Sequence, residues 1–241
     1  MTSTPIRCGF CGSELKPLYQ TFEIANEHRD VFLGYAECPC PQAVAERERE
    51  EAERKAEEAA KAEAERMGRY EKAGIPPKYL TATADLSYGL PRVMAGRGLY
   101  IQGDNGTCKT TYASALAMKV IDLGKSVVFT SSSRMKGELF STTRDNTEED
   151  LFRKWSAPYL LVIDDLGKEC ANKAVVPMLY RVINERDEQM KPVVVTCNFD
   201  KATLGEKLSE CGDVSCAKAI VSRLFGMTDK MVFGGGDRRL L

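Results

Sequence analysis

No apolar run in this 241-residue chain approaches the roughly 20 residues that a membrane-spanning helix needs. The first 30 residues also lack the apolar core of a secretory signal peptide, because Met1–Pro5 leads directly into Arg7 and Cys8. We therefore expect a cytoplasmic protein with no membrane partner. In that compartment the nine cysteines indicate metal ligands and buried thiols, and they argue against a disulfide framework.

The sequence also has no charge excess and no internal repeat. Its formal net charge is −1, from 34 basic and 35 acidic residues, and this balance excludes neither a nucleic-acid partner nor a protein partner. The length fits one large domain or two smaller ones. Histidine is nearly absent: His28, the only one, is either a surface residue or a substitute ligand in a nearby metal site.

Two close cysteine pairs stand in the first 41 residues, one as C-x-x-C-G and the other as C-x-C. The short β-like segments Tyr19–Ile24 and Val31–Tyr35 lie between the pairs and are too small to build a core alone. A hairpin-length insert that joins two thiolate pairs predicts a tetrahedral Zn²⁺ site, and four thiols without metal are the alternative. The predicted ligands are Cys8, Cys11, Cys38 and Cys40.

Residues 42–73 consist almost wholly of Ala, Glu, Arg and Lys. Glu precedes Lys or Arg by four positions several times, for example Glu51 and Lys55, which supports a helix. Such a helix would be about 45 Å long and would serve as a solvated spacer between two domains. The segment Gly74–Pro77 ends it. The predicted domains are therefore a zinc-binding module at 1–41, a helical linker at 42–73 and a third domain at 74–241.

Strand-like and helix-like stretches alternate in the third domain. This alternation predicts an α/β fold, a parallel sheet covered by helices on both faces. The predicted strands are Leu99–Gln102, Ser126–Thr130, Tyr159–Ile163, Val193–Thr196 and Lys230–Phe233.

The stretch from Gly103 to Thr110 nearly matches the P-loop pattern G-x-x-x-x-G-K-[ST]. In a P-loop, backbone N–H groups surround phosphates, the lysine adds positive charge and the following hydroxyl holds Mg²⁺. One position departs, since Cys108 replaces a glycine, and a Cβ penalises conformations that glycine adopts freely. A strand before the loop and a helix predicted at 112–123 favour nucleotide binding over an ordinary glycine-rich turn. The predicted nucleotide-binding residues are Gly103, Asp104, Asn105, Gly106, Thr107, Cys108, Lys109, Thr110 and Thr111.

Two further predicted strands end in polar residues that would complete such a site. Tyr159–Ile163 is followed by Asp164 and Asp165 in a Walker B arrangement. There Asp164 would contribute to the Mg²⁺ shell, and Asp165 would orient or deprotonate the attacking water. The strand at 193–196 leads to Asn198 at the edge that faces the ligand crevice. Asn198 is expected to reach the terminal phosphate or the water; the alternative is that it only caps a turn.

The order of these motifs resembles the DnaC-type replicative helicase loaders of bacteria and phages, and IstB-type transposition ATPases share the same ATPase core. The resemblance runs from Ala73 to the C-terminus. A cysteine-rich N-terminal module followed by a charged helix is also similar to loaders that grip the helicase through a zinc-binding domain. The segments that carry the resemblance are GDNGTCKT, YLLVIDDLGKE, NERDEQMKPVVVTCNF, AIVSRLFGM and GGGDRRL.

The resemblance implies an AAA+ ATPase that acts between subunits, with ATP or ADP, Mg²⁺ and Zn²⁺ as cofactors. By motif position Asn198 matches sensor 1, and Arg223 matches an arginine finger contributed to a neighbour's site. Arg239 matches a sensor 2 arginine that contacts nucleotide. The predicted catalytic residues are thus Asp165, Asn198 and Arg223. Asp165 replaces the glutamate of many AAA+ proteins, an exchange common in this family, whereas Cys108 predicts weakened hydrolysis.

We therefore expect an ATP-dependent loader that binds a hexameric replicative DNA helicase and self-assembles through its AAA+ domains. It would help place the helicase on single-stranded DNA during replication initiation. Arg134, Lys136 and Phe140 either contact that DNA or belong to an ordinary solvated helix. An IstB-like transposition accessory ATPase and a nucleotide-gated adaptor with little hydrolysis are the alternatives. The zinc module favours the loader over the transposition protein.

Overall fold

Two compact units make up the chain, Met1–Ala64 and Glu65–Leu241. The three-part division predicted from composition stays a prediction. Within the described residues, no helix is long and apolar enough to cross a membrane. The computed structural model describes residues 5–24, 27–142, 147–167, 175–211 and 213–235.

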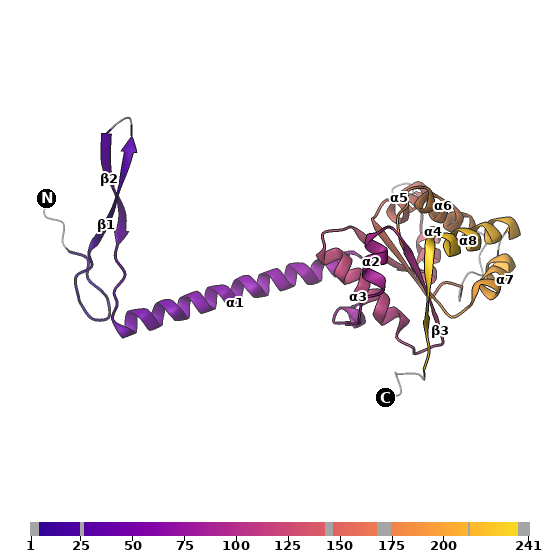
Figure 1. The fold of residues 1–241 in the computed structure, drawn as a ribbon, viewed down its shortest axis with the longest axis horizontal. Helices are drawn as coiled ribbons and strands as arrows, with labels where there is room; N and C mark the ends of the chain where they lie inside the picture. The colour runs from indigo at the N-terminus through magenta and orange to yellow at the C-terminus, as the bar shows by residue number, and fades with distance from the viewer. Residues whose placement is uncertain (1–4, 25–26, 143–146, 168–174, 212, 236–241) are drawn as a thin grey trace. The chain divides into compact units, whose positions relative to one another are not determined.

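The first unit contains an antiparallel hairpin of β1 (Pro17–Ile24) and β2 (Glu27–Tyr35) (Figure 1). The pairing is regular apart from a register shift between Leu18 and Tyr19. Large apolar side chains of the hairpin are exposed, since two strands alone enclose no core. The buried residues of this unit instead gather around the cysteine pairs.

Helix α1 (Pro41–Lys72) follows the cysteine pairs and is 32 residues long. Residues 48–66 of the helix are exposed, and the predicted pair of Glu51 and Lys55 forms an ion pair of 2.7 Å. The helix ends at Lys72, and Gly74, two residues beyond it, has a φ of +91°. A Cβ at this position would lie 2.4 Å from the carbonyl oxygen of Phe129, so glycine is required both by the turn and by the close approach.

The second unit is built on a five-stranded sheet with the order β4-β5-β6-β3-β7, and all of its paired strands are parallel. This order inserts β6 between the strand that enters the P-loop and the strand that ends in the two aspartates. The predicted α/β fold is confirmed, with strand ends displaced by one or two residues. The strands are β3 (Gly98–Gly103), β4 (Val127–Ser131), β5 (Leu160–Asp164), β6 (Val193–Cys197) and β7 (Thr228–Phe233).

Helices cover both faces of this sheet because successive residues of each strand point to opposite sides. On β3, Leu99 and Ile101 pack with one core and Tyr100 with the other. One face is covered by the end of α1 with α2 (Gly89–Met94) and α3 (Lys109–Asp122). The other is covered by α4 (Ser132–Phe140), α5 (Glu148–Ser156), α6 (Val175–Glu188), α7 (Lys201–Cys211) and α8 (Val214–Met227).

A buried arginine fixes the amino ends of the two strands that carry the site. Arg186 of α6 is fully buried and donates to five backbone carbonyls, which compensates its lost hydration. Two of these carbonyls, of Tyr159 and Pro192, immediately precede β5 and β6. Burial lowers the pKa of Arg186 to about 9, so the side chain still carries its charge at neutral pH. Arg186 therefore holds the amino ends of β5 and β6 beside each other, and this fixes the two strands whose carboxyl ends carry the site.

Candidate nucleotide-binding site

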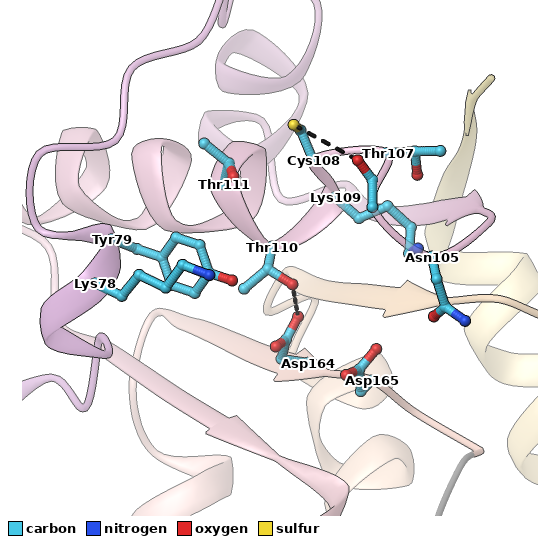
Figure 2. A pocket seen from close by; sticks show the side chains of 11 residues that line it. Lys78, Tyr79, Asn105, Thr107, Cys108, Lys109, Thr110, Thr111, Asp164 and Asp165 are labelled. Atoms are coloured by element: carbon cyan, nitrogen blue, oxygen red, sulfur yellow. Dashed lines mark hydrogen bonds between the residues drawn. The ribbon is translucent and has the colours of Figure 1, made fainter. Parts of the chain in front are cut away.

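The predicted P-loop connects β3 to α3 and holds its lysine folded over the loop (Figure 2). Lys109 is only 6% exposed, and its Nζ donates to the carbonyl oxygens of Gly103 and Asp104 at 2.8 and 2.7 Å. Thr107 Oγ1 donates to the same Asp104 carbonyl at 2.8 Å. Helix α3 begins at Lys109, three residues before the predicted start at 112, because the residues that follow the loop already form its first turn.

Cys108 adopts the backbone conformation that a glycine at this position would adopt without strain. Its φ is +64° and its ψ is +22°, in the left-handed region. A Cβ in this region costs roughly 1–2 kcal/mol, so the substitution of glycine leaves the loop formed but strained. The side chain is half-buried, with Sγ 4.0 Å from the carbonyl oxygen of Gly106.

Asp164, the last residue of β5, and Asp165, which follows it, lie beside the P-loop (Figure 2). Thr110 Oγ1 donates to Asp164 Oδ1 at 2.9 Å, which joins the two predicted Mg²⁺-binding side chains. Asp165 also has a left-handed backbone, with a φ of +53°. A hydroxyl and a carboxylate that converge in this way are the oxygen ligands that Mg²⁺ prefers. The donor set therefore fits a magnesium ion.

Asn198 follows β6 and reaches the P-loop from the neighbouring strand. Its Nδ2 donates to Oδ1 of Asn105 at 2.9 Å, while its own Oδ1 is buried without a hydrogen-bond partner among the described residues. This contact joins residues 93 positions apart. The predicted sensor 1 residue is thus next to the predicted phosphate-binding loop.

A cavity of about 250 Å³ lies between the P-loop and the two aspartates. Its lining contains residues that the motif analysis did not assign, Lys78 and Tyr79 of the short 3₁₀ helix η1 (Pro77–Tyr79). The sequence offered only a proline-rich boundary there, and no local pattern connects it to the P-loop. The remaining lining residues are Asn105, Gly106, Thr107, Cys108, Lys109, Thr110, Thr111, Asp164 and Asp165.

A second cavity of about 420 Å³ shares Cys108 and Thr111 with the first. Its walls include the aromatic rings of Tyr112 and Phe233, which meet edge to face at 5.5 Å. The carboxylate of Asp85 lies at the same cavity and accepts a hydrogen bond from the Ser87 N–H, which lowers the pKa of Asp85. The first cavity is thus lined by the polar P-loop and the two aspartates, and the second cavity is lined in part by aromatic side chains.

Two predicted site residues are not part of this cluster. Arg223 lies on α8, with its guanidinium 5.4 Å from the centre of the Tyr180 ring, and it lines neither cavity. Arg239 lies outside the described residues.

The residues that were predicted as a DNA-contacting cluster do not share one environment: Arg134 is hydrogen-bonded to the main chain, whereas Phe140 is exposed. Arg134 donates to the carbonyl oxygens of Gly74 and Phe129, at 3.0 and 3.3 Å, so its guanidinium fastens the end of α1 to β4. Phe140, in contrast, is 63% exposed. The structure gives Arg134 a packing function that the sequence pattern did not predict.

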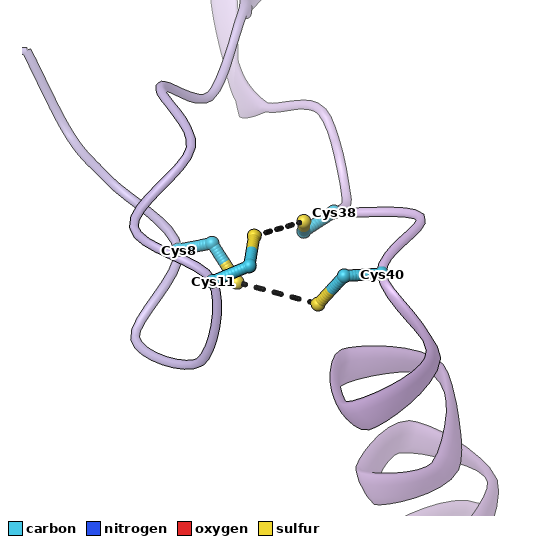
Figure 3. A group of neighbouring side chains, drawn as sticks. All are labelled: Cys8, Cys11, Cys38 and Cys40. Carbon is cyan, nitrogen blue, oxygen red and sulfur yellow. Dashed lines mark hydrogen bonds between the residues drawn. The ribbon is translucent and has the colours of Figure 1, made fainter.

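The four predicted metal ligands converge in the first unit (Figure 3). Cys8 Sγ is 3.9 Å from Cys40 Sγ, Cys11 Sγ is 3.4 Å from Cys38 Sγ, and all four sulfur atoms lie within 4.8 Å of one another. In a tetrahedral Cys₄ zinc site, Zn–S bonds of about 2.3 Å separate the sulfurs by about 3.8 Å. The sulfur cluster fits one zinc ion.

The thiols of this cluster differ in acidity. Hydrogen bonds with the Ser13 hydroxyl and backbone lower the pKa of Cys11 to about 6. A hydrogen bond from the Cys40 backbone lowers the pKa of Cys38, but the contact with Cys11 and burial outweigh it and raise that pKa to about 12. Four neighbouring thiolates repel one another, and a dication would remove that penalty.

The parallel sheet and the P-loop with its Walker B strand define the second unit as an α/β domain of the P-loop class. A family model described as IstB-like ATP binding protein matches residues 41–240. The chain belongs to this ATP-binding family. The cysteine pairs lie before the matched region.

Curated relatives come from two groups. The chain is 28% identical over 167 residues to an ATP-binding protein of insertion sequence IS21 from Pseudomonas aeruginosa, which covers 69% of this chain and 60% of that protein. It is 31% identical over 114 residues to the replicative helicase loader DnaC of Buchnera aphidicola, and the aligned region covers 44% of this chain and 46% of the loader. The chain thus spans less than two thirds of either relative.

Among solved structures, the crystal structure of the DnaC helicase loader has a TM-score of 0.53 at 19% identity. The match covers 66% of this chain and 100% of that chain. At this identity the likeness concerns the fold alone.

Proposed function

We propose that this protein is an ATP-dependent loader that binds a hexameric replicative DNA helicase and helps to load it onto single-stranded DNA. The observation that carries the proposal is the four-sulfur module ahead of the ATP-binding region. The family match begins at residue 41, whereas the cysteines stand at positions 8–40. A separate module attached to a shared ATPase core suits a specific protein partner, and relatives of that core include helicase loaders.

In this proposal the first cavity receives the phosphates of ATP. Backbone N–H groups of the P-loop would bind their oxygens, and Lys109 would exchange its two carbonyl partners for phosphate oxygens. Thr110 and Asp164 would hold Mg²⁺. A bound Mg²⁺ neutralises charge on the β- and γ-phosphates.

The second cavity is suited to the adenosine part of ATP. It continues from the P-loop through the shared residues Cys108 and Thr111. Tyr112 and Phe233 supply apolar surface for a purine ring. The carboxylate of Asp85 could accept a hydrogen bond from an exocyclic amino group, which adenine has and hypoxanthine lacks.

For hydrolysis, we propose that Asp165 orients the attacking water or takes its proton, and that Asn198 contacts the water or the γ-phosphate. Asn198 would have to exchange its contact with Asn105 for this task. Arg223 lines neither cavity of its own subunit, as expected of an arginine that acts in a neighbour's site. Self-assembly through the AAA+ domains would then complete each site. Arg239 would contact the nucleotide as sensor 2.

The N-terminal module would be the part that binds the helicase. Zinc bound by the four cysteines would fold the segment around them, since its apolar content is small. The exposed apolar side chains of the hairpin, such as Tyr19 and Phe32, would then be available to a partner.

Co-purification with a hexameric replicative helicase tests the proposal. We expect the parent protein to retain the helicase and Cys11→Ser to lose it, because that change removes one zinc ligand. Lys109→Ala should still bind the helicase but fail to load it onto single-stranded DNA. Absence of any helicase binding by the zinc-loaded parent, tested against the host's own helicase, would refute the loader function.

A transposition accessory ATPase is the second candidate. The observation in its favour is the IS21 relative, which matches a larger share of this chain than the DnaC relative does. Retention of a transposase in place of the helicase would support it.

A nucleotide-gated adaptor with little hydrolysis is the third candidate, and the strained backbone of Cys108 favours it. Single-turnover hydrolysis distinguishes this adaptor from the loader and from the transposition ATPase.

A further inference from the structure

Thr196 is a buried polar residue for which neither the motifs nor the proposed function gives a role. It lies in β6, whose other residues are three valines and Cys197, and its exposed fraction is 0%. A hydroxyl in such an apolar strand is costly unless it is hydrogen-bonded. Its hydrogen bonds therefore indicate what it does.

The hydroxyl of Thr196 contacts both aspartates at the carboxyl end of β5, Asp164 and Asp165. The N–H of Asp165 donates to Thr196 Oγ1 at 2.9 Å, and Thr196 Oγ1 is 2.6 Å from Asp164 Oδ1. A backbone N–H can only donate, so the hydroxyl oxygen must accept from Asp165. The hydroxyl proton of Thr196 is therefore donated to Asp164 Oδ1. The direction of both hydrogen bonds is thus fixed.

At Asp164 the consequence is a carboxylate held from two sides. Oδ1 accepts a hydrogen bond from Thr110 of α3 and another from Thr196 of β6. Two donors from different elements restrict the rotation of the carboxylate group. Hydrogen-bond partners of this kind orient metal ligands and raise metal affinity.

At Asp165 the consequence is a fixed main chain. Its left-handed φ of +53° is unfavourable for a residue with a Cβ. The peptide groups on both sides are held, since the N–H donates to Thr196 and the carbonyl oxygen accepts from the Ser132 hydroxyl at 2.8 Å. The fixed backbone of Asp165 therefore sets the direction of its Cα–Cβ bond.

We propose that Thr196 is a positioning residue that aligns Asp164 for the metal and Asp165 for the water through one hydroxyl group. The inference rests on the proposed binding of ATP and a divalent cation. It goes beyond that function because it assigns the alignment of both carboxylates to the strand inserted between β3 and β5.

Thr196→Val tests the proposal, because valine keeps the size and β-branching of threonine and removes the hydroxyl. Thr196→Ser restores the hydroxyl without the methyl group. Thr130→Val is the matched control. Thr130 is buried in β4 of the same sheet, and within the part of the chain that the structure describes its hydroxyl contacts only the carbonyl of Ser131, at 3.5 Å.

The first readout is Mn²⁺ binding to the protein–ADP complex, followed by electron paramagnetic resonance. We expect Thr196→Val to weaken Mn²⁺ binding about 10-fold. ADP affinity without metal should stay within about twofold, because the P-loop supplies it. The second readout is the Mg²⁺ concentration that gives half-maximal ATP hydrolysis, which should rise while the KM for ATP at saturating Mg²⁺ changes little.

Parent-like Mn²⁺ binding by Thr196→Val would overturn the proposal, and so would an equal loss in Thr130→Val or no rescue by Thr196→Ser. A parent protein that binds no ADP would overturn the proposed function as well. The two failures are thus distinct. Should Thr196→Val not fold, Thr196→Cys keeps the size with a much weaker hydrogen bond, and the same loss of Mn²⁺ affinity is expected.

Discussion

Replacement of Cys108 by glycine should strengthen the P-loop. The structure holds Cys108 at a φ of +64°, a conformation that costs a residue with a Cβ roughly 1–2 kcal/mol and costs glycine almost nothing. Glycine loses more chain entropy on folding, which opposes the gain by about 0.5–1 kcal/mol. The net gain in the free energy of unfolding is therefore between about 0 and 1.5 kcal/mol. Its midpoint of about 0.75 kcal/mol corresponds to about 1.5–3 °C in the Tm of a chain of this size.

ATP binding should change more than stability does. Cys108 lines both cavities, so in the proposed ATP complex its Cβ would stand where the loop meets the nucleotide. Glycine would let the backbone N–H groups approach the phosphates more closely. If closure over the phosphates releases about 1 kcal/mol at this residue, ATP affinity rises about 5-fold.

Titration calorimetry with a non-hydrolysable ATP analogue measures this affinity, and thermal unfolding without nucleotide measures the stability. Cys108→Ala is the control, because alanine removes the sulfur and keeps the Cβ. We expect the glycine variant to gain in both measurements and the alanine variant to gain in neither. Equal gains in the two variants would refute the backbone argument and identify the thiol itself as the obstacle.

Three further predictions concern the other parts of the molecule. The protein should bind one zinc ion and lose it, with the fold of the first unit, on chelation or in Cys11→Ser; less than half an equivalent in protein purified without chelator would contradict the site. Arg223→Ala should bind ATP normally while hydrolysis falls by about 10³-fold, and mixing it with Lys109→Ala should restore part of the activity. No rescue in co-assembled, folded mixtures would instead assign Arg223 to packing on Tyr180. Lys78→Ala should weaken ATP binding several-fold in fluorescence titrations, increasingly so at low salt, and unchanged affinity would remove Lys78 from the site.

Local patterns in the sequence were enough to predict much of this molecule. The alternation of apolar runs predicted five parallel strands, and the P-loop motif predicted a loop between a strand and a helix, as β3 and α3 show. The spacing of four cysteines predicted a sulfur cluster that the fold brings together. These features are predictable because periodicity, turn chemistry and short motifs depend on residues that are close along the chain.

Other parts of the site depend on contacts between distant segments. Lys78 joins the P-loop from a boundary segment, Thr196 meets Asp164 across 32 positions, and Arg134 binds the carbonyl of Gly74 across 60. No local pattern encodes such contacts, because each depends on how distant segments pack; Thr196, for example, reaches Asp164 because the strand order places β6 beside β5. The sequence alone was thus enough to predict the P-loop and the pair of aspartates that the fold brings together. Which buried hydroxyl aligns the aspartates, and which arginine serves packing, was decided only by how the strands and helices pack.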